Sequence, residues 1–159
     1  ALPPEQAAAL LSLDLPLDHQ PIVNGHFRFA TDGLPGGEAF LGLVGGTAEW
    51  LFRRDGVIST TTSAAAPLSG QPAETIAALL WRDIVRALDL PAGTPLPPHR
   101  IVKEKRATLA QTPAMARARP GAATIWRNLA LAGDWTDTGL PCTIEGAVRS
   151  GRLAVEAID

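Results

Sequence analysis

The hydrophobic and polar positions of residues 21–63 follow the pattern of short strands. Residues 21–30 alternate polar side chains, such as Asn24 and His26, with apolar ones, such as Val23 and Phe27. This two-residue period puts the two sets on opposite faces of a strand. Apolar-rich runs predict further strands over residues 39–44, 48–54 and 57–63.

A longer period in the middle of the chain predicts a helix. Within residues 72–90, apolar side chains recur every four residues, at Ile76, Leu80, Ile84 and Leu88. Such spacing gives a helix one apolar face, and Pro72 suits its first position because a first helical residue needs no N–H partner. A shorter helix is expected ahead of the first strand, over residues 5–13.

Turn-forming residues separate these elements. Asp55-Gly56 predicts a tight hairpin, because glycine accepts a positive φ angle without a steric penalty. The proline-rich residues 91–98 end the helical pattern, and residues 101–109 predict another strand. Residues 112–124 are rich in alanine, arginine and proline, which predicts a loop or a crossing between domains.

The C-terminal part predicts one more strand and one more helix. Residues 128–132 have the character of a short buried strand, and residues 141–158 that of a helix, with Gly139 and Pro141 placed to start it. Several strands, a helix, a strand, a loop, then a strand and a helix predict an α+β fold with a mostly antiparallel sheet.

Composition excludes several classes of partner. The chain has 159 residues, 46% of them hydrophobic, which is enough for one domain. Its net charge is −2 and its lysines and arginines are scattered, so we expect no nucleic-acid partner. Cys142 is the single cysteine, which excludes an internal disulfide and a multi-cysteine metal site. We therefore expect no bound metal.

The sequence also bears on whether the chain is part of a longer protein and on where that protein is located. It opens with Ala1-Leu-Pro-Pro4 rather than an initiator methionine, so we expect a piece of a longer polypeptide. No apolar run reaches the roughly 18 residues that a membrane span needs. We expect a cytoplasmic location, with membrane association of the longer protein left open.

One segment carries a chemical pattern. The predicted strand at 128–132 runs into Gly133-Asp134, and the final helix begins soon after. A helix N-terminus offers unpaired N–H groups and a partial positive charge, which favour electron-rich ligand atoms. Small residues would leave one side of this helix thin enough for a strand or a flat ring to approach: Gly146, Ala147, Ser150, Gly151 and Ala154.

Three motifs in this segment resemble a known family. They are Leu131-Ala-Gly-Asp-Trp-Thr136, Gly139-Leu-Pro141 and Ile144-Glu-Gly-Ala-Val-Arg-Ser-Gly151. In this order they resemble the C-terminal signature of flavin-dependent amine oxidases and phytoene desaturases, and most closely that of the hydroxysqualene dehydroxylases. Two upstream stretches, Phe40–Thr47 and Val102–Thr108, are also similar to that family. Cys142 departs from its pattern, which more often has alanine there.

The resemblance implies a division of the chain and a cofactor. Residues 1–125 would be part of the substrate-binding domain, and residues 126–159 the last strand and helix of a Rossmann-like FAD-binding domain. Asp134 would hydrogen-bond FAD near its ribityl and pyrophosphate groups, and the backbone at Thr143 and Ile144 would face the flavin's pyrimidine edge. The remaining expected cofactor-binding residues are Gly133, Trp135 and Pro141.

The same resemblance implies an activity. Reduced FAD would give a hydride to a polyisoprenoid, turning hydroxysqualene into squalene, or would take one from it as in phytoene desaturation. The chain lacks the Gly-rich fingerprint that holds the ADP half of FAD, which implies that the chain alone is inactive. Its expected partners are the polyisoprenoid, the rest of the FAD-binding domain and, for the isolated chain, a second copy.

Simpler readings remain for most of these residues. Asp134 alone could be a turn or cap residue, and the whole chain could be a free-standing ligand-binding or interaction module. Cys142 fits a small buried side chain better than a catalytic thiol, although a helix start would lower its pKa. The four tryptophans are expected in the core, and the three histidines at the surface or in the core.

Two further segments have a simple explanation. Lys103 and Lys105 share one face of a predicted strand and Arg106 lies on the other, which favours a solvated surface over a substrate channel. The glycines of residues 42–46 lack phosphate-loop spacing and run into a strand rather than a helix, so we reject a phosphate site there.

Overall fold

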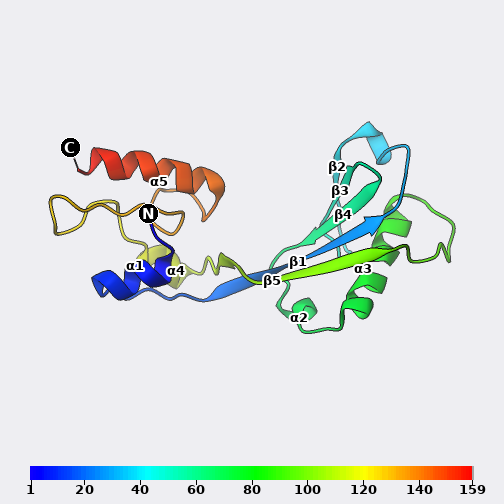
Figure 1. Cartoon of the computed structure of the whole chain (residues 1–159), viewed down its shortest axis with the longest axis horizontal. Helices are drawn as coiled ribbons and strands as arrows, with labels where there is room; N and C mark the ends of the chain where they lie inside the picture. Colours follow the sequence, from blue (N-terminus) through cyan, green and yellow to red (C-terminus); the bar gives the residue numbers. More distant parts are fainter. Residues whose placement is uncertain (159) are drawn as a thin grey trace. The chain divides into compact units, whose positions relative to one another are not determined.

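The computed structural model describes residues 1–158, and the chain forms two compact units (Figure 1). The central unit comprises residues 20–107. The terminal unit comprises residues 1–19 together with the segment from Thr108 onward. The division expected from the sequence, at residues 125 and 126, does not coincide with these units, and its assignment to domains of a longer enzyme stays a prediction.

The central unit is built on a five-stranded antiparallel sheet in the order β2-β3-β4-β1-β5 (Figure 1). The strands are β1 (His19–Arg28), β2 (Phe40–Gly42), β3 (Trp50–Arg54), β4 (Val57–Thr62) and β5 (His99–Leu109). All the strands predicted over residues 21–109 are therefore confirmed, with ends shifted by a few residues. The α+β class is confirmed with them.

The β3–β4 hairpin turns at Asp55-Gly56, as predicted. Both residues have positive φ angles, 49° and 74°. This is the conformation of a two-residue hairpin turn, which matches the right-handed twist of the strands. Aspartate tolerates it because its short side chain can bond locally, and glycine because it has no Cβ.

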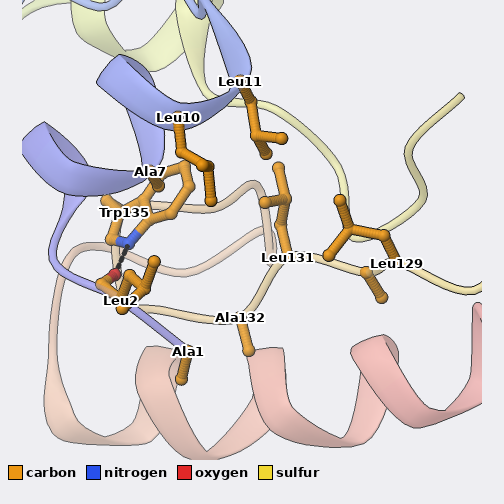
Figure 2. Close-up of a pocket in the computed structure, with 10 residues that line it drawn as sticks. Ala1, Leu2, Ala7, Leu10, Leu11, Leu129, Leu131, Ala132 and Trp135 are labelled. Atoms are coloured by element: carbon orange, nitrogen blue, oxygen red, sulfur yellow. Dashed lines mark hydrogen bonds between the residues drawn. The ribbon is translucent and has the colours of Figure 1, made fainter. Parts of the chain in front are cut away.

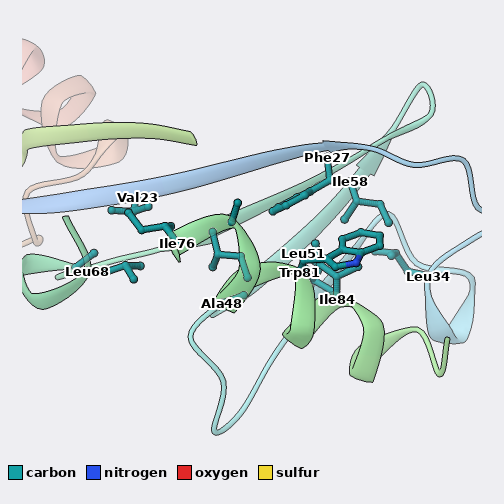
Figure 3. Packing of buried hydrophobic residues seen from close by; sticks show 13 residues of the cluster. Val23, Phe27, Leu34, Ala48, Leu51, Ile58, Leu68, Ile76, Trp81 and Ile84 are labelled. Carbon is teal, nitrogen blue, oxygen red and sulfur yellow. The ribbon is translucent and has the colours of Figure 1, made fainter. Parts of the chain in front are cut away.

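One face of the sheet is covered by α3 (Ala73–Ala87), confirming the predicted helix. Pro72 is the residue before the helix rather than its first member. Figure 3 shows α3 side chains such as Ile76, Trp81 and Ile84 meeting Phe27 and Leu51 of the sheet in a common core. A fully buried aliphatic or aromatic side chain contributes roughly 1.5–3 kcal/mol, so this cluster is the main source of the unit's stability.

The glycine-rich loop between β2 and β3 is held by a carboxylate. Asp83 of α3 is buried, and its Oδ2 accepts hydrogen bonds from the backbone N–H groups of Thr47 (2.5 Å) and Ala48 (3.0 Å). A Cβ on Gly46 would lie 2.9 Å from the same oxygen. The N–H groups thus already bind an anionic side chain, which agrees with the rejection of a phosphate site here.

The terminal unit contains α1 (Pro4–Leu11), α4 (Pro113–Ala118) and α5 (Ile144–Glu156). Its core consists of Ala7, Leu109, Met115, Leu131, Trp135 and Cys142. Helix α4 was not predicted, because residues 112–124 had been expected to form a loop. Its start is nevertheless well formed: Thr112 accepts a hydrogen bond from the N–H of Met115 at 3.1 Å, and Pro113 opens the helix.

The strand predicted over residues 128–132 is wrong. Within residues 1–158 this segment forms only an isolated bridge between Ala130 and Ala123, supported by a hydrogen bond from Leu131 N–H to the Ala122 carbonyl at 2.8 Å. Leu131 instead packs in one core with Ala7 of α1, and Leu11 of α1 packs against that core. An apolar run becomes a strand only where neighbouring strands pair with its backbone N–H and carbonyl groups. Here the neighbouring segment around Ala123 is a loop.

Candidate functional site

The expected cofactor-contact segment is a loop, residues 133–143, that ends where α5 begins. Trp135 sits at its centre and is almost fully buried. The indole N–H donates a hydrogen bond to the Leu2 carbonyl at 3.0 Å (Figure 2). A Cβ on Gly133 would lie 2.2 Å from the indole nitrogen, so only glycine fits there. Trp135 is therefore a core residue around which the loop folds.

Helix α5 is fixed to this loop through Ser150. The Ser150 hydroxyl is buried, accepts a hydrogen bond from Gly133 N–H at 2.8 Å and donates one to the Ala147 carbonyl at 2.6 Å. Near the helix start, a Cβ on Gly146 would lie 2.7 Å from the Pro141 carbonyl oxygen. Gly146 and Ser150, two of the small residues expected on the thin side of this helix, are thus buried against the loop. Ala147 and Gly151 are exposed.

The start of α5 presents open hydrogen-bond donors. Thr143 is the N-cap, and its hydroxyl accepts from Gly146 N–H at 3.1 Å. The N–H groups of Ile144 and Glu145 find no acceptor within residues 1–158. Thr143, Ile144 and Pro141 are exposed, so this positively polarised end of the helix is accessible. The helix begins at Ile144, three residues later than predicted.

Asp134 supplies an acceptor close to these donors in the sequence. It is half-buried, and within residues 1–158 its carboxylate accepts no hydrogen bond; only its backbone carbonyl does, from Arg119 at 2.9 Å. A half-buried carboxylate without donors is a good acceptor for hydroxyl groups of a ligand. Asp134 is therefore not acting as a helix cap, since Thr143 has that role.

Arg119 shapes the loop from outside the motif. Its guanidinium donates to the carbonyls of Leu140 at 2.6 Å, Asp134 at 2.9 Å and Thr136. Its Nε is buried and has no partner within residues 1–158. Two guanidinium nitrogens hold these three carbonyls, whereas the three donors of a lysine would share one nitrogen. Sequence reasoning missed this residue because the segment around it had been taken for an irregular loop.

Cys142 is buried at the end of the loop. Its backbone N–H donates to Gln111 Oε1 at 3.3 Å. Burial raises the pKa of the thiol above its ordinary value, the negative charge of Asp134 raises the pKa further, and Arg119 opposes both. The expectation that the helix start would lower this pKa is wrong, because the loss of hydration outweighs it. The thiol has the environment of a structural side chain.

The remaining candidates are not part of this loop. In the central unit, the Lys103 ammonium donates to the Gln71 carbonyl, while Lys105 and Arg106 are exposed. The histidines do not gather: His26 contacts Ser59, His99 lies 3.4 Å from Glu74, and His19 lies 3.3 Å from Glu5. Trp81 is buried as expected, but Trp50 and Trp126 are exposed, which corrects the prediction that all tryptophans lie in the core.

The outer face of α5 is apolar and uncovered. The large apolar side chains of α5 and of Ile158 just beyond its end remain 49–87% exposed: Ile144, Val148, Val155 and Ile158. None of the helices in residues 1–158 combines the length and apolar character that crossing a lipid bilayer requires.

Comparison with known proteins gives one consistent result. The family described as flavin containing amine oxidoreductase matches residues 17–159. A hydroxysqualene dehydroxylase of Rhodopseudomonas palustris is 48% identical over 159 residues, and one of Sinorhizobium fredii is 46% identical over 157. One of Zymomonas mobilis is 39% identical over 158 residues. Each match covers 98–99% of this chain but only 37% of the relative.

Proposed function

Because the chain belongs to the flavin containing amine oxidoreductase family, we propose that it is the C-terminal part of an FAD-dependent oxidoreductase. Two observations in the matched region carry the proposal: the Asp134 carboxylate accepts no hydrogen bond within residues 1–158, and the N–H groups at the start of α5 are open. Asp134 lies in the loop before α5 and the open N–H groups in the first turn of α5, both within the matched residues 17–159. When bound, the flavin supplies hydride transfer to or from a substrate carbon.

Asp134 and the start of α5 provide complementary contacts. The Asp134 carboxylate would accept hydrogen bonds from hydroxyl groups of the flavin's ribityl chain. The open N–H groups of Ile144 and Glu145 would hold the electron-rich pyrimidine part of the ring. A helix N-terminus stabilises negative charge by about 0.3–1 kcal/mol in addition to its hydrogen bonds, so this end of α5 favours the reduced ring.

The other expected cofactor-binding residues act by shaping the loop. The N–H and carbonyl of Gly133 are engaged by Ser150 and Thr136, and the Trp135 indole is engaged by Leu2. Pro141 lies where the chain enters α5, and its carbonyl accepts from the Thr143 hydroxyl at 3.2 Å. We assign these residues the role of fixing the positions of Asp134 and the first turn of α5.

The proposed substrate is a polyisoprenoid. The relatives are named for hydroxysqualene, so conversion of a hydroxylated isoprenoid to the hydrocarbon is the favoured reaction, ahead of phytoene-type desaturation. The chain spans 37% of these relatives, so the proposal includes a partner, the rest of the FAD-binding domain. Residues 1–125 would belong to the substrate domain and residues 126–159 to the FAD-binding domain. We propose a cytoplasmic location, with access to lipid.

A two-part experiment tests this proposal. The full-length protein, purified from cells, should be yellow, with flavin absorbance near one FAD per chain, and should convert hydroxysqualene to squalene in the presence of a reductant. The 159-residue chain alone should be colourless after gel filtration, because it offers only part of the FAD contacts. A full-length protein without flavin would contradict the proposal, as would a yellow 159-residue chain, which would favour a free-standing flavin-binding module.

A further inference from the structure

The sheet of the central unit has one face that α3 does not cover, and that face is ordered by polarity. The strand register aligns its outward side chains in two rows across β2, β3, β4 and β1. One row runs Gly42, Trp50, Thr61, Asn24, and the other runs Phe40, Phe52, Ser59, His26. In both rows the β2–β3 end is aromatic and the β4–β1 end is polar.

The aromatic end is an open cluster. Phe40, Trp50 and Phe52 are 41–52% exposed, and the Phe40 ring lies 6.1 Å from the Trp50 ring and 6.3 Å from the Phe52 ring. Together with Thr61 they line a shallow hollow of about 270 Å³. A Cβ on Gly42 would lie 3.4 Å from the Trp50 ring, so the absence of a side chain there lets this ring lie close to β2.

The polar end consists of two hydrogen-bonded pairs. The Thr61 hydroxyl donates to Asn24 Oδ1 at 2.8 Å, and His26 Nδ1 lies 2.9 Å from the Ser59 hydroxyl. The Thr61–Asn24 pair can form further hydrogen bonds, because the Thr61 oxygen can still accept one and the Asn24 amide nitrogen can still donate one. Thr61 is therefore the polar group at the wall of an otherwise aromatic hollow.

From this gradient we infer that the uncovered face binds an isoprenoid alcohol, with the hydrocarbon on Phe40, Trp50 and Phe52 and the hydroxyl on the Thr61–Asn24 pair. Aromatic faces pack well against branched, unsaturated hydrocarbon. The choice of an isoprenoid alcohol as the ligand rests on the proposed function. The choice of its contact residues rests on the two rows of outward side chains in the sheet.

The size of the patch argues against a second copy of the chain as occupant. A stable protein interface buries about 800 Å² on each partner, whereas an aromatic side chain offers about 150–250 Å² in all. These three rings are already half covered, so they present a few hundred Å². A hollow of about 270 Å³ is near the lower limit of small-molecule sites and holds a segment of an isoprenoid chain.

The test uses the 159-residue chain and a matched pair of probes, farnesol and the hydrocarbon farnesene. We expect farnesol to shift the NMR signal of the Trp50 indole N–H and to leave that of Trp81, on the covered face, unchanged. Phe52→Ala should weaken farnesol binding about tenfold, and Phe52→Leu less. Thr61→Val should leave farnesene binding unchanged and reduce the preference for farnesol about fivefold.

Val44→Ala is the matched control, because Val44 is 97% exposed in the same unit and lies outside both rows. Equal farnesol binding by the Phe52 variants and the control would overturn the inference. So would a Trp50 signal that moves with protein concentration alone, since a second copy would then cover the patch. Flavin content is not measured here, so failure of this test leaves the proposed function standing, and loss of flavin in the full-length protein leaves this test intact.

Discussion

The Ser150 hydroxyl lies 2.8 Å from the backbone nitrogen of Gly133, seventeen residues earlier in the chain, and accepts its hydrogen bond. This bond joins α5 to the loop that carries Asp134. Because Ser150 is buried and its hydroxyl also donates to the Ala147 carbonyl, removing that hydroxyl would leave the Gly133 N–H without its acceptor. The orientation of the helix start relative to Asp134 depends on it.

Ser150→Ala should therefore destabilise the terminal unit. The Gly133 N–H would lose its acceptor, which costs about 1–3 kcal/mol for a buried group. Urea unfolding followed at the indole signal of Trp135 measures this loss. Ser63→Ala is the control, because Ser63 is exposed and its side chain makes no hydrogen bond within residues 1–158. Equal unfolding midpoints for the two variants would show that Ser150 does not hold the loop.

Arg119→Lys should destabilise the same loop by about 2 kcal/mol. Lysine keeps the charge, but its single nitrogen replaces the two guanidinium nitrogens that donate to the carbonyls of Leu140, Asp134 and Thr136. Faster amide hydrogen exchange over residues 134–142 would report the loosened loop. Arg117→Lys, at an exposed position on α4, should leave exchange unchanged. The same exchange pattern in both variants would contradict the role of the guanidinium.

Cys142 should give stability a pH dependence in the alkaline range. Its folded pKa is raised by burial above the ordinary thiol value of 9.0, so the buried neutral thiol contributes fully below that value. The contribution is lost as the pH rises through the folded pKa, since the thiolate is better solvated in the unfolded chain. Cys142→Ala should flatten the decline of unfolding free energy above pH 9. If the unfolding free energy of the variant declined as steeply as that of the parent chain, other groups would be its cause.

The uncovered face of α5 should make the isolated chain self-associate. Its four large apolar residues form a row that water would otherwise contact. Sedimentation at about 100 μM, high enough to reveal μM association, should show dimers, and Val148→Glu should return the chain to monomers. Val44→Glu, an equally drastic change at an exposed loop position, should not. A strictly monomeric parent chain would show that this face tolerates water.

Local patterns predicted the central unit well. The alternation in residues 21–30, the Asp55-Gly56 turn and the four-residue period around Ile84 each describe contacts close in sequence or repeated along one element. The uncovered sheet face was not foreseen, because exposed Trp50 and Phe52 have the same residue types as a core. Only the register showed which side of the sheet they occupy.

The candidate site was predicted in part. The motif from Leu131 to Gly151 gave the correct helix and its cap region, because capping is local. The strand over residues 128–132 failed because a strand needs partners, and partners are not encoded in the segment itself. Arg119 could not be found from the sequence, since its hydrogen bonds reach 15–21 residues along the chain and leave no local periodicity.

The most direct test of the account is the flavin content of the full-length protein with Asp134→Asn. Loss of the carboxylate should weaken a hydrogen bond to the ribityl chain by about 1–3 kcal/mol, so that FAD is lost during gel filtration while the circular dichroism spectrum is unchanged. Asp137→Asn is the control, because Asp137 is exposed in the same loop and, within residues 1–158, its carboxylate accepts only from Gly139 N–H at 3.2 Å. The account predicts that only the Asp134 variant loses flavin; full flavin retention and full turnover in that variant would contradict it.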